Sequence, residues 1–186
     1  MSEHYLRYLA PGYDRAEVLE DLMREYGEDV WRFAYFLTRR RDAADDIAQE
    51  TFIVAYRRLY AFRGESSVKS WLLGIARNKS LHYLRSAFFR KVVLTDAVAI
   101  KKDAAGAAES AEDIVFGQIA ASGVWETVMT LQRKHREVVL MAYHYEMTMT
   151  EIASALGVSE GTVKSRLSRA KRKMSELLDE SRAKGG

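Results

Sequence analysis

The sequence predicts an all-α fold made of two small helical domains joined by a flexible linker. Apolar residues recur at spacings of three and four along most of the 186-residue chain, which is the period of a helix that buries one side. No stretch alternates apolar and polar residues for long enough to indicate a sheet. The chain has one proline and eleven glycines, so long helices meet few interruptions.

The first domain is expected over residues 14–95. Apolar stripes indicate one helix over 18–37 and a second over 44–54. A short polar segment at 63–67 indicates a turn, and a third helix is expected over 68–85. Together these helices would form a compact bundle.

A change in composition separates the first domain from the second. We expect a linker over 96–122, because residues 103–113 contain five alanines and four acidic residues but no large apolar side chain. The second helical domain is expected over 123–180. The first 13 residues are expected to form an N-terminal tail.

The composition excludes several kinds of site. The chain has no cysteine, which rules out disulfides, thiolate metal sites and a cysteine nucleophile. Its four histidines are scattered, so neither a metal nor a cofactor is expected. The longest apolar run, 138–143, is far shorter than the roughly 20 residues of a membrane span. The first 12 residues lack the apolar core of a signal peptide, so we expect a cytoplasmic protein without membrane contact of its own.

Charge is distributed unevenly along a chain whose net charge is only +3. Residues 14–50 hold eleven acidic and six basic side chains, whereas residues 77–102 hold seven basic and one acidic. Residues 159–173 hold six basic side chains and one acidic. This separation favours one surface for a polyanion and another for a basic partner. Ordinary solvated helix faces explain the charge counts equally well.

The second domain contains a helix-turn-helix pattern. Thr148 and Glu151 have the spacing of a capping box, and Gly157 stands where a helix end needs a positive φ. Ser159 can cap the next helix, whose basic side would fit the major groove of DNA. The expected DNA-contacting residues are Thr162, Lys164, Ser165, Arg166, Ser168, Arg169, Lys171 and Arg172. Lys164, Ser165, Ser168 and Arg169 would read bases, and Arg166, Lys171 and Arg172 would hold phosphates. The alternative is a basic surface helix that follows a glycine turn by coincidence.

Three segments of the chain resemble the bacterial RNA polymerase sigma factors, in the order of that family. Residues 42–52 (Asp-Ala-Ala-Asp-Asp-Ile-Ala-Gln-Glu-Thr-Phe) resemble its signature helix, and residues 61–79 are similar to its second conserved block. Residues 159–171 are similar to its reader of the −35 element. The short chain, with only a linker between the two domains, resembles the extracytoplasmic-function group. The resemblance implies a region 2-like domain over 14–95 and a region 4-like domain over 123–180.

The function implied by this resemblance is promoter recognition without catalysis. Such a subunit binds core RNA polymerase, recognises the −35 and −10 elements of promoter DNA and promotes promoter opening. The resemblance also implies an anti-sigma factor that holds the chain inactive.

The resemblance assigns roles to two further sets of residues. In the family, the polar side of the signature helix meets a basic coiled coil of the polymerase. Helical spacings of three and four residues place the following side chains on that side: Asp42, Asp45, Asp46, Gln49 and Glu50. The second set would capture an extruded −10 base and hold strand phosphates: Arg63, Gly64, Glu65, Ser66, Ser67, Lys69, Trp71, Arg77, Asn78, Lys79 and Arg85. For Trp71, packing in the core is an alternative role. The family commonly has an aspartate where this chain has His82, which bears on −10 recognition.

Two other functions stay open at this point. A stand-alone DNA-binding regulator would share the Arg136-Glu-Val-Val-Leu segment before the helix-turn-helix, but it would leave residues 62–79 without a role. A metal-dependent phosphodiesterase would use the acidic helix, but it needs a second acidic cluster that the sequence does not show.

Overall fold

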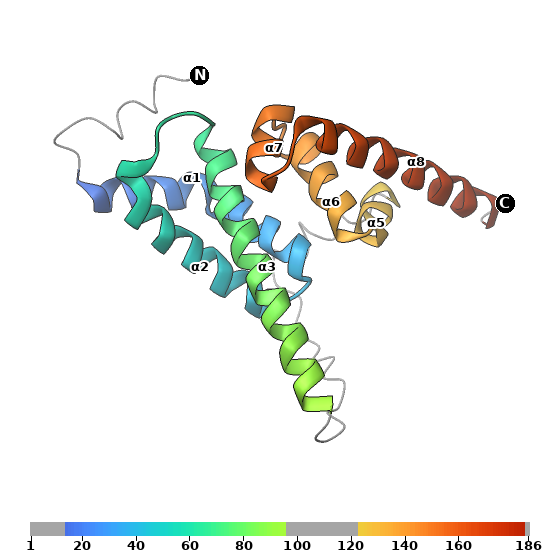
Figure 1. Cartoon of the computed structure of the whole chain (residues 1–186), viewed down its shortest axis with the longest axis horizontal. Helices are drawn as coiled ribbons and strands as arrows, with labels where there is room; N and C mark the ends of the chain where they lie inside the picture. The colour runs from blue at the N-terminus through green and yellow to red at the C-terminus, as the bar shows by residue number, and fades with distance from the viewer. Residues whose placement is uncertain (1–13, 96–122, 185–186) are drawn as a thin grey trace.

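The computed structural model describes residues 14–95 and 123–184, with side chains over 14–87 and 124–180. These residues form helices joined by short turns, and no strand occurs among them, so the predicted all-α class is confirmed. The helices fall into two groups, α1–α3 and α5–α8 (Figure 1). The predicted tail, 1–13, and the predicted linker, 96–122, lie outside the described residues.

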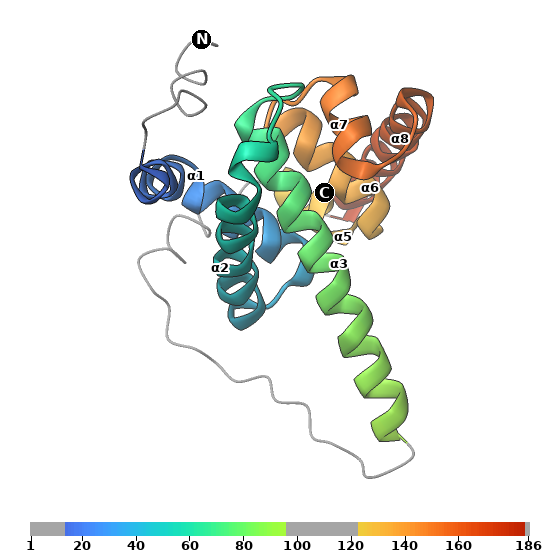
Figure 2. The same cartoon turned by 60° about the vertical axis from the view of Figure 1, so that its left-hand side comes forward.

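The N-terminal group contains three helices. α1 (Arg15–Thr38) begins after Asp14, whose carboxylate accepts a hydrogen bond from the backbone N–H of Ala16 at 2.8 Å. α2 (Arg41–Arg58) follows at once and ends in the short 3-10 turn η2 (Leu59–Ala61). α3 (Val68–Thr95) runs ten residues beyond the predicted end, and its C-terminal half projects past the other helices (Figures 1 and 2).

The C-terminal group is built from short helices and one long one. α5 (Gly123–Thr130) and α6 (Arg133–Val139) lead into η3 (Leu140–His144), a single π-helical turn. α7 (Met149–Leu156) and α8 (Glu160–Lys184) then form the predicted helix-turn-helix.

The two groups pack against each other and share one continuous hydrophobic core. Phe33 of α1 meets the ring of Tyr145 edge-on, with centroids 5.6 Å apart, and Phe36 stacks on Trp125 at 5.7 Å. The buried hydroxyl of Tyr145 donates a hydrogen bond to the carbonyl of Asp29 at 3.0 Å. α7 lies beside the N-terminal half of α3 (Figures 1 and 2). The sequence predicted two domains but not this contact between them.

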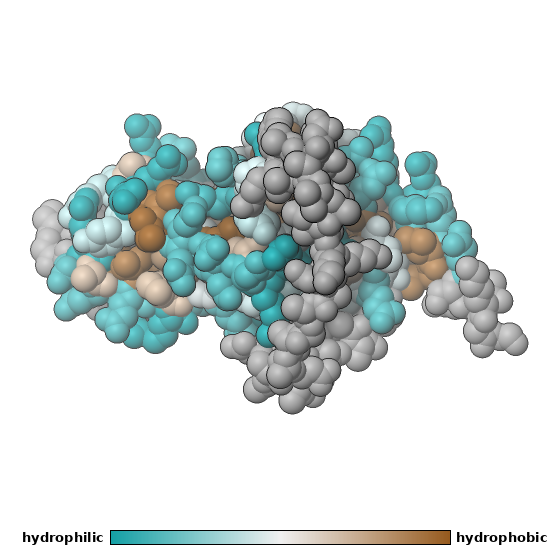
Figure 3. Space-filling model, turned by 90° about the horizontal axis from the view of Figure 1, so that it is seen from below, coloured by the Kyte–Doolittle hydropathy of each residue, from teal (hydrophilic) through white to brown (hydrophobic). Residues whose placement is uncertain are grey.

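Little apolar surface is left on the face seen in Figure 3, where brown side chains form small patches separated by hydrophilic ones. Among the described residues, the large apolar side chains that stay exposed are Met23, Ile53, Tyr56, Tyr60, Val124 and Tyr143. None of the described helices is long and apolar enough to cross a membrane.

Candidate nucleic-acid interface

α2 presents the predicted acidic face to solvent. All five predicted residues of this face are exposed: Asp42, Asp45, Asp46, Gln49 and Glu50. Ile47 and Thr51 of the same helix are buried. The Thr51 hydroxyl donates a hydrogen bond to the Ile47 carbonyl at 2.7 Å, so this polar group has a partner inside the core. The helix therefore separates a packed side from a charged side, as its sequence period predicted.

Three carboxylates of this acidic face have partners within the chain. Arg40 donates to both oxygens of Asp42, at 3.0 and 2.6 Å, and this hydrogen bonding holds the pKa of Asp42 below its ordinary value. The indole N–H of Trp31 donates to Asp45 at 2.6 Å and so ties α1 to α2. Lys79 of α3 pairs with Glu50 at 2.7 Å. Lys79, predicted to hold DNA, thus also neutralises one end of the acidic face.

The predicted −10 loop connects η2 to α3. Gly64 has a φ of 71°, a left-handed conformation that costs glycine little. Arg63, Glu65 and Ser67 are exposed beside it, and Ser66 is half-buried. The Ser67 hydroxyl accepts from the backbone N–H of Ser70 at 3.2 Å and caps the start of α3. The loop is therefore a fixed turn that presents small polar groups.

Trp71 lies at the edge of the core. Its ring is half-buried and lies 4.7 Å, centroid to centroid, from the ring of Phe62. This position favours the packing role over the DNA-stacking role.

The predicted strand-holding residues of α3 lie in two different environments. Asn78 and Arg85 are exposed, with His82 between them at helical spacing. Arg77, by contrast, is only 13% exposed, because its guanidinium Nε lies 3.2 Å from a carboxylate oxygen of Glu137 in α6. Lys69 pairs with Asp29 at 2.9 Å. In this conformation Arg77 is part of the contact between the two helix groups.

The helix-turn-helix has the local geometry that the sequence predicted. Thr148 accepts from the backbone N–H of Glu151 at 3.2 Å, and Glu151 accepts from that of Thr148 at 2.9 Å, which completes the capping box. Gly157 has a φ of 64° at the end of α7. Ser159 accepts from the N–H of Thr162 at 3.2 Å and caps α8.

The outer side of α8 carries most of the predicted DNA-contacting side chains. Lys164, Ser165, Ser168, Arg169, Lys171 and Arg172 are exposed, while Thr162 and Arg166 are half-buried. The Thr162 hydroxyl lies 3.0 Å from that of Ser159, within the cap. The Lys171 ammonium lies 5.3 Å from the centre of the Tyr143 ring, on a flank of α8 different from that of Arg169 and Arg172.

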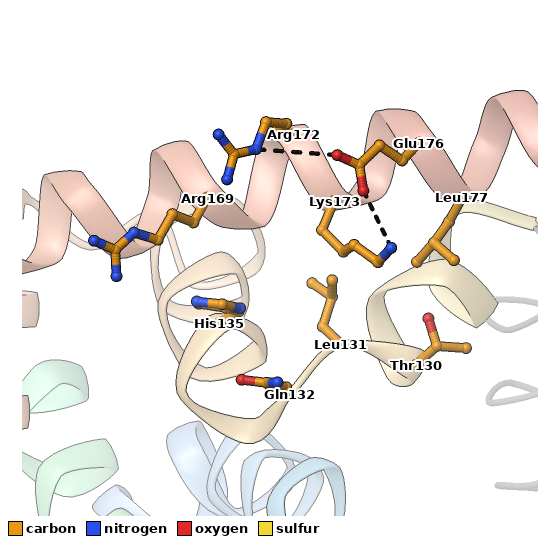
Figure 4. Close-up of a pocket in the computed structure, with 9 residues that line it drawn as sticks. All are labelled: Thr130, Leu131, Gln132, His135, Arg169, Arg172, Lys173, Glu176 and Leu177. Carbon is orange, nitrogen blue, oxygen red and sulfur yellow. Dashed lines mark hydrogen bonds and ion pairs between the residues drawn. The ribbon is translucent and has the colours of Figure 1, made fainter.

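A basic pocket of about 320 Å³ lies between α8 and the start of α6 (Figure 4). Its cationic side chains are Arg169, Arg172 and Lys173, and the ring of His135 lies on the α6 side. Glu176 offsets part of this charge, since it pairs with Lys173 at 3.1 Å and with Arg172 at 4.0 Å. His135 and Lys173 were not among the DNA-contacting residues predicted from the sequence. The sequence shows only that a histidine and a lysine lie on neighbouring helices, which does not bring them together.

His144 lies in the contact between the two helix groups. Its ring meets those of Phe36, Trp125 and Tyr145 at centroid distances of 6.1, 5.3 and 4.6 Å. Burial lowers the pKa of His144 below the ordinary 6.5. The nearby charges are those of Asp29, which opposes this shift, and those of Arg32 and Lys69, which add to it.

We expect the chain to lose stability as the pH falls from about 7 to about 5. Because the fold favours a neutral imidazole at His144, the unfolded chain takes up the proton first. The contribution of His144 is therefore complete above pH 6.5 and declines as the pH falls toward the lowered pKa of the folded chain. Urea unfolding across this range measures the effect. The variant His144→Gln should lose less stability, and a flat profile for the unmodified chain would contradict the prediction.

No group of three or more acidic or histidine side chains in the described part of the chain is arranged to hold a metal ion. What the geometry offers instead is an acidic face on α2, a polar loop before α3 and a basic outer side on α8.

Two family profiles match the two helix groups separately. Sigma-70 region 2 matches residues 22–88, and Sigma-70, region 4 matches residues 123–174. The first contains the acidic face of α2 and the loop before α3. The second contains the helix-turn-helix.

Whole-chain comparisons agree with these profiles. The ECF RNA polymerase sigma factor SigL of Mycobacterium tuberculosis is 32% identical over 89% of this chain and 91% of its own length. The RNA polymerase sigma factor YlaC of Bacillus subtilis is 26% identical over 88% and 94%. Among solved structures, the sigma factor RpoE of Bartonella quintana, in complex with the anti-sigma factor NepR, matches 86% of this chain and 98% of its own, with a TM-score of 0.65 and 27% identity.

These matches decide among the functions that the sequence left open. Both helix groups match regions of one family, in that family's order, and nearly the full length of a relative is covered. Sigma factors are transcription initiation factors, not enzymes, which sets aside the phosphodiesterase and the stand-alone regulator. The chain belongs to the extracytoplasmic-function (ECF) group of RNA polymerase sigma factors.

Proposed function

We propose that the two helix groups divide promoter recognition between them. As a sigma factor, the chain binds core RNA polymerase and promoter DNA. Residues 14–95 would provide the polymerase contact and the −10 contact, and residues 123–180 the −35 contact. The observation that carries this proposal is the outer side of α8, where hydroxyl and basic side chains stay exposed while the capped turn fixes the helix against α7. The site of action is the cytoplasm, where RNA polymerase works.

The polymerase contact is the acidic face of α2. Asp46 and Gln49 lie at its centre, exposed, and Asp42 and Glu50 lie toward its ends. A basic surface of the polymerase would be steered toward such a face and bind it by charge complementarity.

The −10 contact is the loop before α3 together with the exposed side of that helix. The turn at Gly64 presents exposed polar groups of the loop, and these would contact an unstacked base. Asn78 and Arg85 lie along the helix on an exposed side and would hold the strand. The cost of unstacking one base, a few kcal/mol, would be offset by these contacts.

The −35 contact is the N-terminal half of α8 in the major groove. Lys164, Ser165, Ser168 and Arg169 would face base edges, and Arg166, Lys171 and Arg172 would hold the phosphates on either side. The basic pocket with His135 and Lys173 extends the flank of Arg172, and its charge suits a phosphate of the same strand.

We also propose that an anti-sigma factor regulates the chain. The likeness to RpoE of Bartonella quintana, solved in complex with the anti-sigma factor NepR, supports this proposal. Such a partner would cover the polymerase-binding and DNA-binding surfaces until a stimulus releases it.

Replacement of Arg169 by alanine tests the −35 assignment. We expect it to lower the preference for one base pair of the −35 element by roughly 5- to 150-fold, or about 1–3 kcal/mol, because a bidentate contact to guanine would be lost. The measurement is transcription by reconstituted holoenzyme from promoters randomised in the −35 element.

The matched control is Lys171→Ala, which removes one positive charge from the same helix. If Lys171 holds a phosphate, all promoters should weaken uniformly and the salt dependence should become less steep. An unchanged −35 preference in Arg169→Ala would remove Arg169 from the set of base-reading residues. Failure of the unmodified chain to direct any promoter-specific initiation would overturn the proposed function itself.

A further inference from the structure

A tryptophan of α1 holds one of the carboxylates of the acidic face. The indole N–H of Trp31 donates a hydrogen bond to Oδ1 of Asp45 at 2.6 Å, although the two residues are 14 positions apart and belong to different helices. An indole N–H can only donate and an ionised carboxylate can only accept, so the direction of this bond is fixed. The second oxygen of Asp45 accepts no hydrogen bond from the described part of the chain, and Asp45 is exposed. That oxygen can therefore receive a donor from another molecule.

The ring of Trp31 is itself held in place. It is half-buried and stacks on the ring of Tyr35, one helical turn further along α1, with centroids 5.5 Å apart and planes 2° from parallel. It also packs against a small buried cluster of α1 and α2, formed by Ala34, Ala43, Ala44 and Ile47. A rotation of the ring would break these contacts, so its N–H group keeps one direction. The Asp45 carboxylate is thus bonded to a donor that does not move.

The carboxylates at the two ends of the acidic face are already paired with cations of the chain. Arg40 binds Asp42 at 2.6 Å, and Lys79 binds Glu50 at 2.7 Å. A basic partner would have to displace these cations before it could bind either carboxylate fully. The attraction that the ends of the face offer to such a partner is therefore reduced.

The centre of the acidic face keeps its charge. Asp45 contacts the neutral indole of Trp31, and no cation of the described residues pairs with Asp45 or with its exposed neighbour Asp46. Two uncompensated carboxylates thus follow each other in α2, and one of them has a set orientation. A partner that binds a carboxylate already held in place avoids the entropy cost of ordering a mobile side chain.

We propose that Trp31 is a positioning residue for the polymerase contact. It holds one oxygen of Asp45, sets the carboxylate in one orientation and leaves the other oxygen for a lysine or arginine of the polymerase. Asp45 and Asp46 form the charged centre of the acidic face, while Asp42 and Glu50 contribute less. The inference rests on the proposed function, which assigns this face to core polymerase.

Replacement of Trp31 by phenylalanine tests the inference. The variant Trp31→Phe loses the indole N–H but keeps an aromatic ring that can stack on Tyr35. We expect the affinity of the full chain for core polymerase to fall by about 3- to 10-fold, because the Asp45 carboxylate would have to be ordered during binding. Titration of labelled chain with core polymerase at physiological salt measures the affinity, and urea unfolding shows whether the variant is folded.

A double-mutant cycle separates positioning from a purely structural role. The variant Asp45→Asn removes the charge but keeps an oxygen that can accept the indole N–H. If Trp31 acts through the charge of Asp45, adding Trp31→Phe to Asp45→Asn should change the affinity by less than about twofold. If Trp31 only packs α1 on α2, its replacement should cost the same factor in both backgrounds, and the inference would be overturned.

A second variant leaves the ring of Trp31 untouched. Asp45→Glu keeps the charge at an exposed helical position but moves the carboxylate outward by one methylene group, away from the indole N–H. We expect it to lower the affinity by about 3- to 10-fold as well. The matched control is Asp179→Glu, the same exchange at an exposed position of α8 outside the proposed contacts, which should leave the affinity unchanged. An affinity of Asp45→Glu equal to that of the control would contradict the inference.

The charge reversal Asp46→Lys distinguishes failure of this inference from failure of the proposed function. If Asp46→Lys weakens binding while Trp31→Phe and Asp45→Glu bind as tightly as the unmodified chain, the acidic face binds polymerase without positioning by Trp31. If Asp46→Lys binds normally as well, the polymerase contact lies elsewhere, and the function proposed for α2 fails together with the inference.

Discussion

Exchange of Asp46 for lysine is expected to weaken binding of the chain to core RNA polymerase by roughly a hundredfold, or about 3 kcal/mol. Asp46 is exposed on the acidic face of α2, so the substitution should leave the fold intact while placing a positive charge against a basic partner surface. Substitution of Asp45, alone or together with Asp46, is a less suitable test of the polymerase contact. Asp45 accepts the Trp31 indole N–H at 2.6 Å, and its replacement would also disturb the packing of α1 on α2.

The affinity of labelled chain for core polymerase, titrated at low and at physiological salt, measures this effect. The matched control is Glu180→Lys, which makes the same charge change at an exposed position of α8. It should leave the affinity near that of the unmodified chain. If Asp46→Lys binds core polymerase as tightly as the control does, α2 is not the docking helix.

Removal of the Arg77 side chain is expected to lower the free energy of unfolding by about 3–5 kcal/mol. Its partner Glu137 is 2% exposed, so Arg77→Ala leaves a carboxylate buried without its closest cation. Arg133, at 3.5 Å, still offers partial compensation, which places the expected loss toward the lower end of that range. Urea unfolding at neutral pH, followed by circular dichroism, measures it.

The double variant Arg77→Met, Glu137→Leu separates the ion pair from the packing. Replacement of both partners by apolar side chains of similar size removes the need to desolvate two charges. The free energy of unfolding of the double variant should therefore equal or exceed that of the unmodified chain. A loss below about 1 kcal/mol for Arg77→Ala alone would mean that the carboxylate of Glu137 is not held in a buried pair.

The features that could be predicted from the sequence are those encoded over three to eight neighbouring residues. The capping box of Thr148 and Glu151, the positive φ at Gly157 and the cap at Ser159 depend on local chemistry, and all three have the expected geometry. The exposed acidic side of α2 likewise follows from the helical period alone. The residues proposed to touch polymerase and the −10 element were assigned by resemblance, and those proposed to touch the −35 element from the helix-turn-helix pattern. Both sets stay predictions.

The features that escaped prediction depend on residues far apart in the chain. Ser67 and Glu151, which share a hydrogen bond, are separated by 84 positions, and the hydrophobic pattern of a helix indicates which side is buried but not what buries it. The same limit applies to Arg77, whose charge indicated a DNA contact while its partner Glu137 lies on another helix. The third helix was expected to end near Arg85, yet no proline or glycine follows before Thr95 and the helix continues to that residue.

The shared core has a consequence for protein engineering. Phe36 stacks on Trp125, and Tyr145 reaches back to Asp29, so each half of the chain has side chains shaped to the other half. A hybrid that fuses the first half of one relative to the second half of another would bring unmatched surfaces together. Such a hybrid would take its −10 preference from the first parent and its −35 preference from the second, while the packing between its two halves would match neither parent.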